Sequence, residues 1–346
     1  MKAILAYSPL LHTKIRKTIA AEQAKPNHTG SWRTDFLKRL APYATGGKLI
    51  RGSLVCFSYE AFAGQKPTPE IIDVAIALEL IHSALLMHDD VMDNDDFRRG
   101  RPSFHNQYKK IGRRQGLVEP ERFGANMAIC AADMCLFLAQ RLLADAPLAV
   151  HELFGDVLIE VCDGQMQDIY SQARPHAPSK QAIYNLMRAK TASYTLSLPL
   201  AVGAALAGQP PATVNKLRRL GDAAGTIFQI RDDELGIMGD TNKTGKPVGA
   251  DIREGKKTLI YYYLMKTCDI RERHRLREIF GNPDIGLSDI AAVQKFIKQH
   301  NITRLLGVEI QRLEGRALRT LETIDLPNQY KTELKSLIAF CAQRQA

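Results

Sequence analysis

Two aspartate clusters are the residues in this chain best suited to chemistry. The first holds Asp89, Asp90 and Asp93, and the second holds Asp232 and Asp233, about 140 residues later. Each cluster ends a long apolar helical pattern, where carboxylates without partners are costly. Grouped carboxylates supply the oxygen ligands that a divalent cation prefers. Because basic residues follow each cluster, the pattern favours a metal-dependent reaction on a substrate made of phosphate groups.

The first cluster is predicted to lie at the end of a helix over residues 68–95. Asp89 and Asp93 are one turn apart and share a face, whereas Asp90 lies about 100° away around the helix. Three carboxylates this close repel one another, and Mg²⁺ would relieve that repulsion. His82 lies two turns before Asp89 on the same face, so both a core position and a functional position stay open for it.

The second cluster ends a predicted helix over residues 210–237. By analogy with the first cluster, a third carboxylate is expected at position 236, but glycine stands there. Metal ligation is therefore predicted to rest mainly on Asp232, with Asp233 or Asp251 as further candidates. The two clusters together predict one magnesium site with unequal halves.

Two segments rich in basic residues follow the clusters and are predicted to be loops. Residues 96–118 contain arginines and lysines, and residues 239–257 combine glycines with lysines. Glycines let backbone amides approach an anion, and the basic side chains supply positive charge. Both segments are therefore predicted to bind phosphate. The basic run over residues 271–275 fits a solvated surface better than an anion site.

The composition is that of an ordinary globular protein of 346 residues. Its 47 basic and 37 acidic residues give a net charge of +10, which mildly favours an anionic partner. Nucleic acid is not expected, because the chain has no zinc-finger spacing and no basic stripe interleaved with aromatics. Six cysteines without a CxxC pair predict reduced thiols in a cytosolic protein.

Nearly every segment shows the hydrophobic period of an α-helix, and strand alternation is hard to find. We predict an all-α protein whose single large domain covers residues 1–346, with residues 1–30 as an N-terminal helical extension. No signal peptide is recognised, and the apolar stretch 196–206 is too short to span a bilayer. A cytoplasmic protein without a transmembrane segment is expected. The remaining predicted helices cover residues 9–22, 31–43, 47–64, 121–145, 147–173, 179–208, 256–268, 270–281, 288–299, 302–324 and 327–344.

Five motifs in one order resemble the trans-isoprenyl diphosphate synthase, or polyprenyl synthetase, family. The resemblance runs from about residue 45 to the C-terminus and is more specific than the aspartate pattern alone. Its first two motifs are Gly46-Gly47-Lys48-Leu49-Ile50-Arg51 and the segment from Glu79 to Arg98-Arg99-Gly100. The other three are Gly164-Gln165 with Asp168, Lys190-Thr191, and Phe228 to Asp233 with the lysines up to Lys257. Gly52, where proline is common, and Gly236 depart from the family pattern.

The resemblance implies a head-to-tail condensation of isopentenyl diphosphate with an allylic diphosphate, in the central cavity of a helical bundle of the isoprenoid synthase type. It implies about three Mg²⁺ ions per active site, and the ligands it implies are Asp89, Asp90, Asp93, Asp232 and Asp233. The residues implied to act in catalysis are Asp89, Asp93, Asp232, Lys190, Thr191 and Gln229. Isopentenyl diphosphate would bind to Lys48, Arg51, His82 and Arg99. The allylic diphosphate would bind to Arg98, Lys190, Lys246 and Lys256.

Product length is expected to depend on the side chains just before the first aspartate. In the family, a bulky aromatic residue at the fourth or fifth position upstream looks like a stop at short products. Here Leu85 and Ala84 stand at those positions. At about 1.5 Å per helical residue, Ala84 lies roughly 7.5 Å below Asp89. We predict products of C20 or longer, with geranylgeranyl diphosphate first among them; a close helix contact at Ala84 is the alternative.

Two other functions stay open. A terpene cyclase of the same helical type would ionise the diphosphate without adding an isoprene unit. It needs no second diphosphate pocket, so Lys48, Arg51 and His82 argue against it. A non-catalytic subunit that modulates another synthase would be expected to lose its aspartate clusters, whereas this chain keeps the first intact and the leading pair of the second. The resemblance also implies a homodimer.

Overall fold

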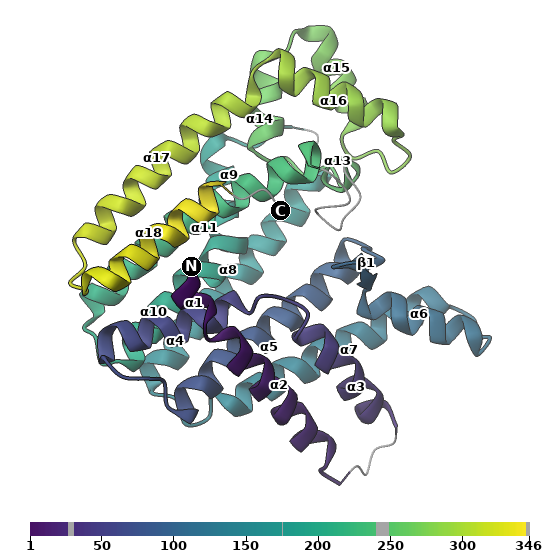
Figure 1. The fold of residues 1–346 in the computed structure, drawn as a ribbon. Helices are drawn as coiled ribbons and strands as arrows, with labels where there is room; N and C mark the ends of the chain where they lie inside the picture. The colour runs from purple at the N-terminus through teal and green to yellow at the C-terminus, as the bar shows by residue number, and fades with distance from the viewer. Residues whose placement is uncertain (27–30, 175, 240–248, 344–346) are drawn as a thin grey trace. The chain divides into compact units, whose positions relative to one another are not determined.

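The computed structural model describes residues 1–26, 31–174, 176–239 and 249–343 (Figure 1). These residues are helical almost throughout, and the strands among them are β1 (Phe97–Arg98) and β2 (Arg101–Pro102). The predicted all-α class is therefore confirmed. Contacts divide the chain into an N-terminal unit (residues 2–151 and 202–209) and a C-terminal unit (residue 1, residues 152–201 and 210–346). One domain over residues 1–346, with an extension over residues 1–30, stays a prediction.

The N-terminal unit is built around α5 (Pro69–Met92), the helix that ends at the first aspartate cluster. Residues 74–84 of α5 are buried without interruption. A helix that is apolar on all sides belongs in the interior of a protein. The helices packed around it are α2 (Ser8–Gln23), α3 (Trp32–Ala44), α4 (Ile50–Ala63), α6 (Phe104–Arg114) and α7 (Pro120–Leu142), and α1 (Lys2–Leu5) contacts α4.

The C-terminal unit is built around α11 (Pro211–Met238), which ends at the second aspartate cluster. Its neighbours are α9 (Lys180–Met187), the π-helix η1 (Arg188–Ser197), α13 (Ala250–Arg253), α14 (Leu259–Thr267), α16 (Leu287–Gln299), α17 (Ile302–Glu322) and α18 (Asn328–Gln343). Helix α15 (Ile270–Ile279) packs on α16. Two of the boundaries between the units fall inside α8 (Leu148–Ala173) and α10 (Leu198–Leu206).

Among the described residues, helices α5 and α7 are long and apolar enough to span a membrane when judged by length and composition alone. In α5, 72% of the apolar window is buried inside the protein, as expected for a core helix. In α7 the buried share is 33%. The predicted absence of a transmembrane segment therefore stays a prediction.

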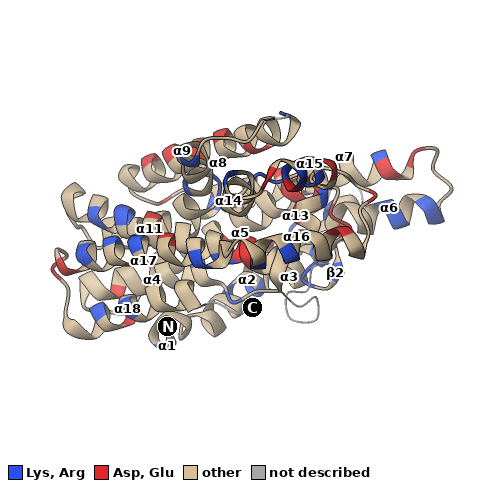
Figure 2. Ribbon diagram, turned by 90° about the horizontal axis from the view of Figure 1, so that it is seen from above, with Lys and Arg blue, Asp and Glu red and all other residues tan. Residues whose placement is uncertain are grey.

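The prediction of a loop over residues 96–118 is wrong, because the segment holds the β1–β2 hairpin and α6. The turn of the hairpin is Arg99-Gly100, with left-handed φ angles of 52° and 70°, as a tight two-residue turn requires. Helix α6 buries Phe104 and Tyr108, and its basic residues gather toward its end (Figure 2). One buried aromatic residue per turn inside a basic segment is too weak a period to identify from the sequence.

The predicted helix over residues 179–208 is divided into α9, η1 and α10. Two glycines of α11 let the backbone of η1 approach closely. A Cβ atom at Gly221 would lie 2.4 Å from the Cα of Ser197, and one at Gly225 would lie 2.6 Å from the Cα of Ala192. These glycines are the sequence signal for the close contact. Hydrophobic period alone does not distinguish a π-helix from an α-helix.

Candidate active site

The first aspartate cluster separates into exposed and buried carboxylates. Asp89 and Asp93 are partly exposed, whereas Asp90 is fully buried. Asp90 accepts a hydrogen bond of 2.7 Å from Arg98 Nε and one of 3.3 Å from the hydroxyl of Tyr43. Asp89 and Asp93 are therefore the two carboxylates of this cluster that a ligand could reach.

Arg98 is held inside this cluster. Its guanidinium lies 3.5 Å from Asp89 and 3.3 Å from Asp95, besides its contact with Asp90. Burial raises the pKa of Asp90 to about 6, against the effect of Arg98. Burial alone would lower the pKa of Arg98, but the facing carboxylates outweigh it and raise that pKa. Arg98 is predicted to bind the allylic diphosphate, and here it is also the counter-ion of a buried aspartate.

Three of the residues predicted to bind isopentenyl diphosphate lie close together in the N-terminal unit. His82 is 8% exposed, and burial, followed by the charges of Arg51 and Arg99, lowers its pKa well below the usual value. The guanidinium of Arg99 packs on Gly47, where a Cβ atom would lie 2.9 Å from Nη1. Lys48 follows Gly47 and is exposed. A neutral imidazole beside these cations can donate a hydrogen bond from its ring N–H to an anion.

The backbone before α4 explains how these cations are presented. The predicted helix over residues 47–64 begins instead at Ile50, because Leu49 has a left-handed φ of 49°. A leucine in this region is strained. The strained residue separates Lys48 from Arg51, which lies in the first turn of α4.

Glu79 is a buried carboxylate near these cations, and it has no predicted role from the sequence. It is 3% exposed and accepts a hydrogen bond of 2.8 Å from the backbone N–H of Gly52. Burial raises the pKa of Glu79, against the charge of Arg51. A Cβ atom at Gly52 would lie 2.9 Å from the carbonyl oxygen of Ala75, so α4 packs tightly on α5. A lone charge inside an apolar helical run was the signal that could have identified Glu79.

The two residues predicted to set product length differ in exposure. Ala84 is fully buried, and Leu85 is partly exposed. Full burial agrees with a close helix contact at Ala84, the alternative that the sequence left open. The role of both residues in product length stays a prediction.

The second aspartate cluster repeats the pattern of the first. Asp232 is exposed, whereas Asp233 is 7% exposed and accepts a hydrogen bond of 2.7 Å from Gln229 Nε2. Burial raises the pKa of Asp233 well above its usual value, and the charge of Asp251 adds to the effect. Asp233 is therefore held as a neutral acid over a wide pH range, and Asp232 is the group open to a ligand.

Asp251 lies in the space beside Gly236. A Cβ atom at position 236 would lie 2.6 Å from Oδ2 of Asp251. The backbone N–H of Gly249 donates to the carbonyl of Gly236 at 3.1 Å, which ties this segment to the end of α11. Lys256 Nζ lies 3.4 Å from Oδ1 of Asp251. A third carboxylate thus reaches the second cluster from α13, a later helix.

Lys190 and Thr191 lie on η1. Lys190 Nζ donates to Asp168 Oδ2 at 2.7 Å, which joins the middle motif of α8 to η1. Gly164 permits this contact, because a Cβ atom there would lie 2.9 Å from the backbone nitrogen of Lys190. Thr191 is partly exposed. Insertions of π-helix are frequent at functional sites, which agrees with the predicted role of this segment.

The lysines after the second cluster have different surroundings. Lys256 pairs with Glu254 and Asp251. Lys257 Nζ lies 2.6 Å from the carbonyl oxygen of Ser171 and also contacts that of Arg174, so it caps the end of α8 and is not directed at a phosphate. Lys246, predicted to bind the allylic diphosphate, lies outside the described residues.

Comparison with known proteins decides which family this arrangement represents. The family model described as polyprenyl synthetase matches residues 34–298. The chain belongs to the polyprenyl synthetase family. The short chain isoprenyl diphosphate synthase of Methanocaldococcus jannaschii is 35% identical over 258 residues, which cover 73% of each protein. The protein of the same name from Methanothermobacter thermautotrophicus is 31% identical over 288 residues, which cover 81% of this chain and 82% of that protein.

A solved structure of this family agrees with the fold over almost the whole chain. It is a geranylgeranyl pyrophosphate synthase from Corynebacterium glutamicum, complexed with isoprenyl diphosphate and magnesium. It superposes with a TM-score of 0.90 at 29% identity, and the match covers 98% of both chains. As a polyprenyl synthetase, this chain is a prenyltransferase that acts on isoprenoid diphosphates. Other relatives are named farnesyl, geranylgeranyl, geranylfarnesyl and heptaprenyl diphosphate synthases, so family membership leaves product length open.

Proposed function

We propose that this polyprenyl synthetase condenses isopentenyl diphosphate with an allylic diphosphate, head to tail, and releases a trans-polyprenyl diphosphate of C20 or longer. One observation carries the proposal. The N-terminal unit holds the partly exposed carboxylates of Asp89 and Asp93 together with a separate group of Arg51, Arg99 and neutral His82. Carboxylates suit a metal-bound diphosphate, whereas the cations suit a second diphosphate. A terpene cyclase would need only the first set.

The proposal includes Mg²⁺, about three ions per active site as the resemblance implies. Asp89, Asp93 and Asp232 fit as ligands, because they are the exposed or partly exposed carboxylates of the two clusters and Mg²⁺ prefers carboxylate oxygens. Asp90 and Asp233 are buried and already hydrogen-bonded, which argues against direct ligation by either. When bound, Mg²⁺ would stabilise the charge that develops on the leaving diphosphate.

The remaining residues would bind the two substrates. Lys48, Arg51, His82 and Arg99 are proposed to bind isopentenyl diphosphate. Positive charge for the allylic diphosphate would come from Arg98, Lys190, Lys246 and Lys256. Charge-assisted hydrogen bonds to phosphate oxygens are stronger than neutral ones. Both groups would therefore hold their substrates at a fixed place for the reaction.

The reaction would then proceed through a carbocation. The allylic C–O bond breaks and its electron pair leaves with the diphosphate. The dipoles of Thr191 and Gln229 are proposed to stabilise the cation that remains, and apolar helical walls exclude water that would quench it. The double bond of isopentenyl diphosphate forms the new C–C bond, and the departing diphosphate takes the proton that is lost.

One assay tests this function and its alternatives. Purified protein, Mg²⁺ and radiolabelled isopentenyl diphosphate are combined in turn with dimethylallyl, geranyl or farnesyl diphosphate. Chain lengths are read from the dephosphorylated products. Label in products of C20 or longer is the expected result. A cyclase would release hydrocarbon without consuming label, and a non-catalytic subunit would be inactive alone and indifferent to Asp89→Ala in a complex with its partner.

We propose that the side chains of Ala84 and Leu85, which precede Asp89 on α5, limit product length. Ala84→Phe should shorten the product, because the larger side chain would take space that the growing chain needs. Leu85→Phe is a second variant, at a position that is more exposed. Overpacking at a buried alanine costs about 1–3 kcal/mol, so thermal unfolding is measured alongside. An unchanged product ladder in both folded variants would overturn the proposal.

We further propose a cytoplasmic homodimer. Ile129 and Phe137 of α7 are 40% and 70% exposed and lie about two turns apart on one face. A second copy would cover these apolar side chains, which are costly in water. Phe137→Glu should yield monomers in size-exclusion chromatography with light scattering, whereas Val118→Glu, at a residue 98% exposed outside the helix, should remain dimeric. A dimeric Phe137→Glu protein would contradict the proposal.

A further inference from the structure

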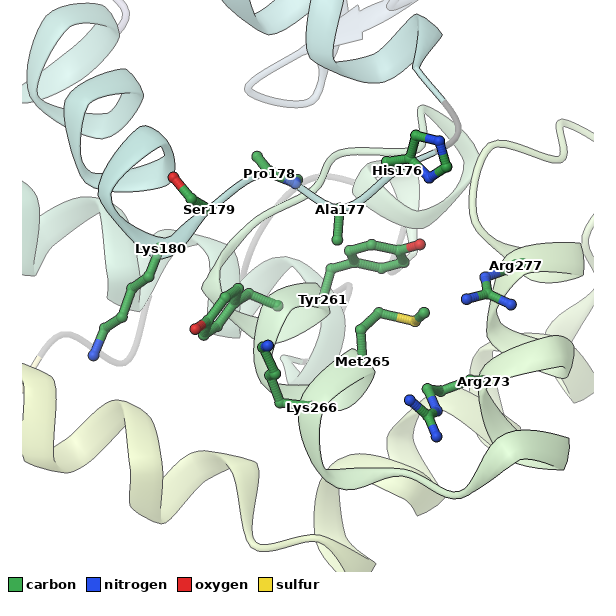
Figure 3. A pocket seen from close by; sticks show the side chains of 11 residues that line it. His176, Ala177, Pro178, Ser179, Lys180, Tyr261, Met265, Lys266, Arg273 and Arg277 are labelled. Atoms are coloured by element: carbon green, nitrogen blue, oxygen red, sulfur yellow. The ribbon is translucent and has the colours of Figure 1, made fainter.

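A cavity of ≈ 830 Å³ opens in the C-terminal unit, lined by the segment that leads into α9 and by helices α14 and α15 (Figure 3). Two kinds of side chain meet in its wall. Tyr261, Tyr262 and Met265 of α14 form an aromatic and apolar side. Arg273 and Arg277 extend from α15 toward it. None of its lining residues belongs to the proposed catalytic or substrate-binding set.

Lys180 in this wall pairs with Glu309, but the charges of the other basic residues that line the cavity are not neutralised by described residues. No carboxylate lines the cavity, and within the part of the chain that the structure describes Lys266, Arg273 and Arg277 form no ion pair. Lys266 Nζ lies 5.9 Å from the ring centre of Tyr262, and Arg273 Nε donates to a backbone carbonyl. By contrast, Arg275 on the outer side of the same helix pairs with acidic residues. Lys266, Arg273 and Arg277 are thus available to an anion.

We propose that this cavity binds a small diphosphate ester. Its diphosphate would contact Lys266, Arg273 and Arg277, and its apolar or aromatic body would lie on the two tyrosines. Arg273 and Arg277 are one turn apart on the same face of α15, so both can reach one anion, and guanidinium groups form paired hydrogen bonds with phosphate oxygens. Isoprenyl diphosphates and nucleoside diphosphates share this chemistry. The basic run over residues 271–275, interpreted from the sequence as solvated surface, thus has one residue in a site.

Calorimetric titration of the full chain in EDTA, which removes divalent metal, tests the proposal with geranyl diphosphate, ADP and inorganic diphosphate. Arg273→Gln/Arg277→Gln should weaken binding of the preferred ester by about tenfold or more, since each lost charge-assisted contact is strong. Arg271→Gln/Arg275→Gln removes two charges from the same helix outside the cavity and should leave the affinity within about twofold. The ester that binds more tightly shows whether the ligand is an isoprenyl diphosphate or a nucleoside diphosphate.

Two results would overturn the site. The first is an unchanged affinity in the Arg273→Gln/Arg277→Gln protein. The second is equal affinity for inorganic diphosphate and for both esters, which would leave the tyrosines without a role. Turnover with isopentenyl diphosphate is measured in parallel and should be unchanged in both variants. Absence of turnover in the wild-type protein would refute the proposed function and leave the binding result standing.

A second site rests on a separate cluster in the same unit. Cys268, Glu272 and His300 meet where α14 ends, α15 begins and α16 ends, and their donor atoms all lie within 4.8 Å of one another. Cys268 is buried, and the side chains of Glu272 and His300 are each 22% exposed. His300 Nε2 lies 2.8 Å from Glu272 Oε2. The three groups are held by different helices and are already oriented toward one another.

We propose that this cluster binds Zn²⁺, with water as the fourth ligand. Sulfur, imidazole and carboxylate are the donors of tetrahedral zinc sites, whose ligand atoms stand about 3.5 Å apart, so small side-chain rotations would close the present arrangement. Burial, with the carboxylate of Glu272, raises the pKa of the Cys268 thiol to about 12, and the metal would replace its proton. The ion would join the turn between α14 and α15 to the end of α16.

Titration with Co²⁺ tests this site independently of catalysis. A thiolate-to-cobalt charge-transfer band is expected in the wild-type protein and in Cys162→Ser, which changes an exposed cysteine of α8. Cys268→Ser should lose the band, and His300→Ala should weaken binding by about tenfold or more. A band that persists in Cys268→Ser, or a wild-type protein without one, would overturn the proposal.

Discussion

The two aspartate clusters have the same arrangement of carboxylates and differ in how the buried carboxylate is neutralised. Each ends the central helix of its unit, and in each the first aspartate is open whereas the second is buried. Asp90 lies against the cation of Arg98, whereas Asp233 accepts from the neutral amide of Gln229. The buried carboxylate next to a candidate metal ligand can thus be ionised, as in Asp90, or protonated, as in Asp233. The two halves need not respond alike to the same substitution.

The third carboxylate shows the other difference. In the first cluster Asp93 follows Asp89 by one turn of the same helix. In the second cluster Gly236 holds the equivalent position, and the carboxylate of Asp251 lies against it. A glycine on the central helix thus leaves room for a carboxylate from a later helix, at the place where the first cluster has its third aspartate.

The largest expected effect comes from removing the open carboxylate of either cluster. Asp89→Ala and Asp232→Ala should each lower kcat by about 10³-fold, the scale of losing a group that stabilises charge in a transition state. The rate of incorporation of labelled isopentenyl diphosphate measures it. Unfolding midpoints should be unchanged, because neither side chain is buried. Full activity in one variant would show that the two clusters do not act as equals.

A smaller loss of rate is expected at the third carboxylate of the second cluster. Asp251→Ala should lower kcat by about 10²-fold and weaken the activating affinity for Mg²⁺, because it would remove a candidate oxygen ligand. Gly236→Asp should also be impaired, since its Cβ atom would lie 2.6 Å from Oδ2 of Asp251. Steady-state kinetics over a Mg²⁺ series measure both.

Combining the two substitutions gives the matched control. Gly236→Asp/Asp251→Ala places the carboxylate on α11, as in the first cluster, and should recover most of the activity that Asp251→Ala loses. Coupling between neighbouring positions is what a double-mutant cycle detects. Additive losses would mean that Asp251 does not stand in for a third aspartate.

The sequence predicted the open carboxylates well, because their spacing at the end of an apolar helix is a local property. It could not separate Asp90 from Asp89, since burial depends on Tyr43 and Arg98, which come from other elements. The position of Asp251 depends on its contact with Gly236, which is distant in the sequence. Such contacts leave only weak traces in a single sequence, here a glycine at position 236.

The fold class could be predicted from the sequence, but not every helix could. Long apolar helices such as α5 and α11 were identified because their hydrophobic period extends over many turns. Helix α6 was missed because its buried residues are few and its basic residues resemble a phosphate-binding loop. The π-helix η1 was missed because its geometry follows from close packing against Gly221 and Gly225, which period does not record.

The buried aspartates should differ in their effect on stability. Asp90 is ionised at pH 7 although the folded state raises its pKa to about 6, so folding disfavours this charge, and Asp90→Asn should raise the free energy of unfolding by about 2–3 kcal/mol. Asp89 and Asp95 still face Arg98 in the variant. Asp233→Asn replaces a neutral acid by a neutral amide and should change stability by about 0.5 kcal/mol or less. Urea denaturation at pH 7 measures both values. Equal changes in the two variants would contradict the assigned charge states.

The last prediction concerns a feature that the two helices share farther from their ends. Ten residues before the first aspartate of each cluster stands another acid, Glu79 on α5 and Asp222 on α11. Burial raises the pKa of both. Glu79 is held against the N–H of Gly52, whereas a hydrogen bond from Ser197 opposes the effect at Asp222. The pKa should therefore be raised more at Glu79.

The sign of the pH dependence follows from proton counting. Above about pH 4 the unfolded chain has lost the proton that the folded state still holds, so stability falls as pH rises, by at most about 1.4 kcal/mol per pH unit. The stability that each protonated acid confers is complete below its unfolded pKa and is lost as pH rises through the folded pKa. Compared with Glu79→Gln and Asp222→Asn, the wild-type protein should therefore lose stability in urea titrations from pH 4 to 8. The slope should be steeper for the Glu79 pair, because Glu79 is buried and Asp222 is partly exposed. A steeper slope for Asp222 would contradict the inference that the Glu79 side chain is more deeply buried than that of Asp222.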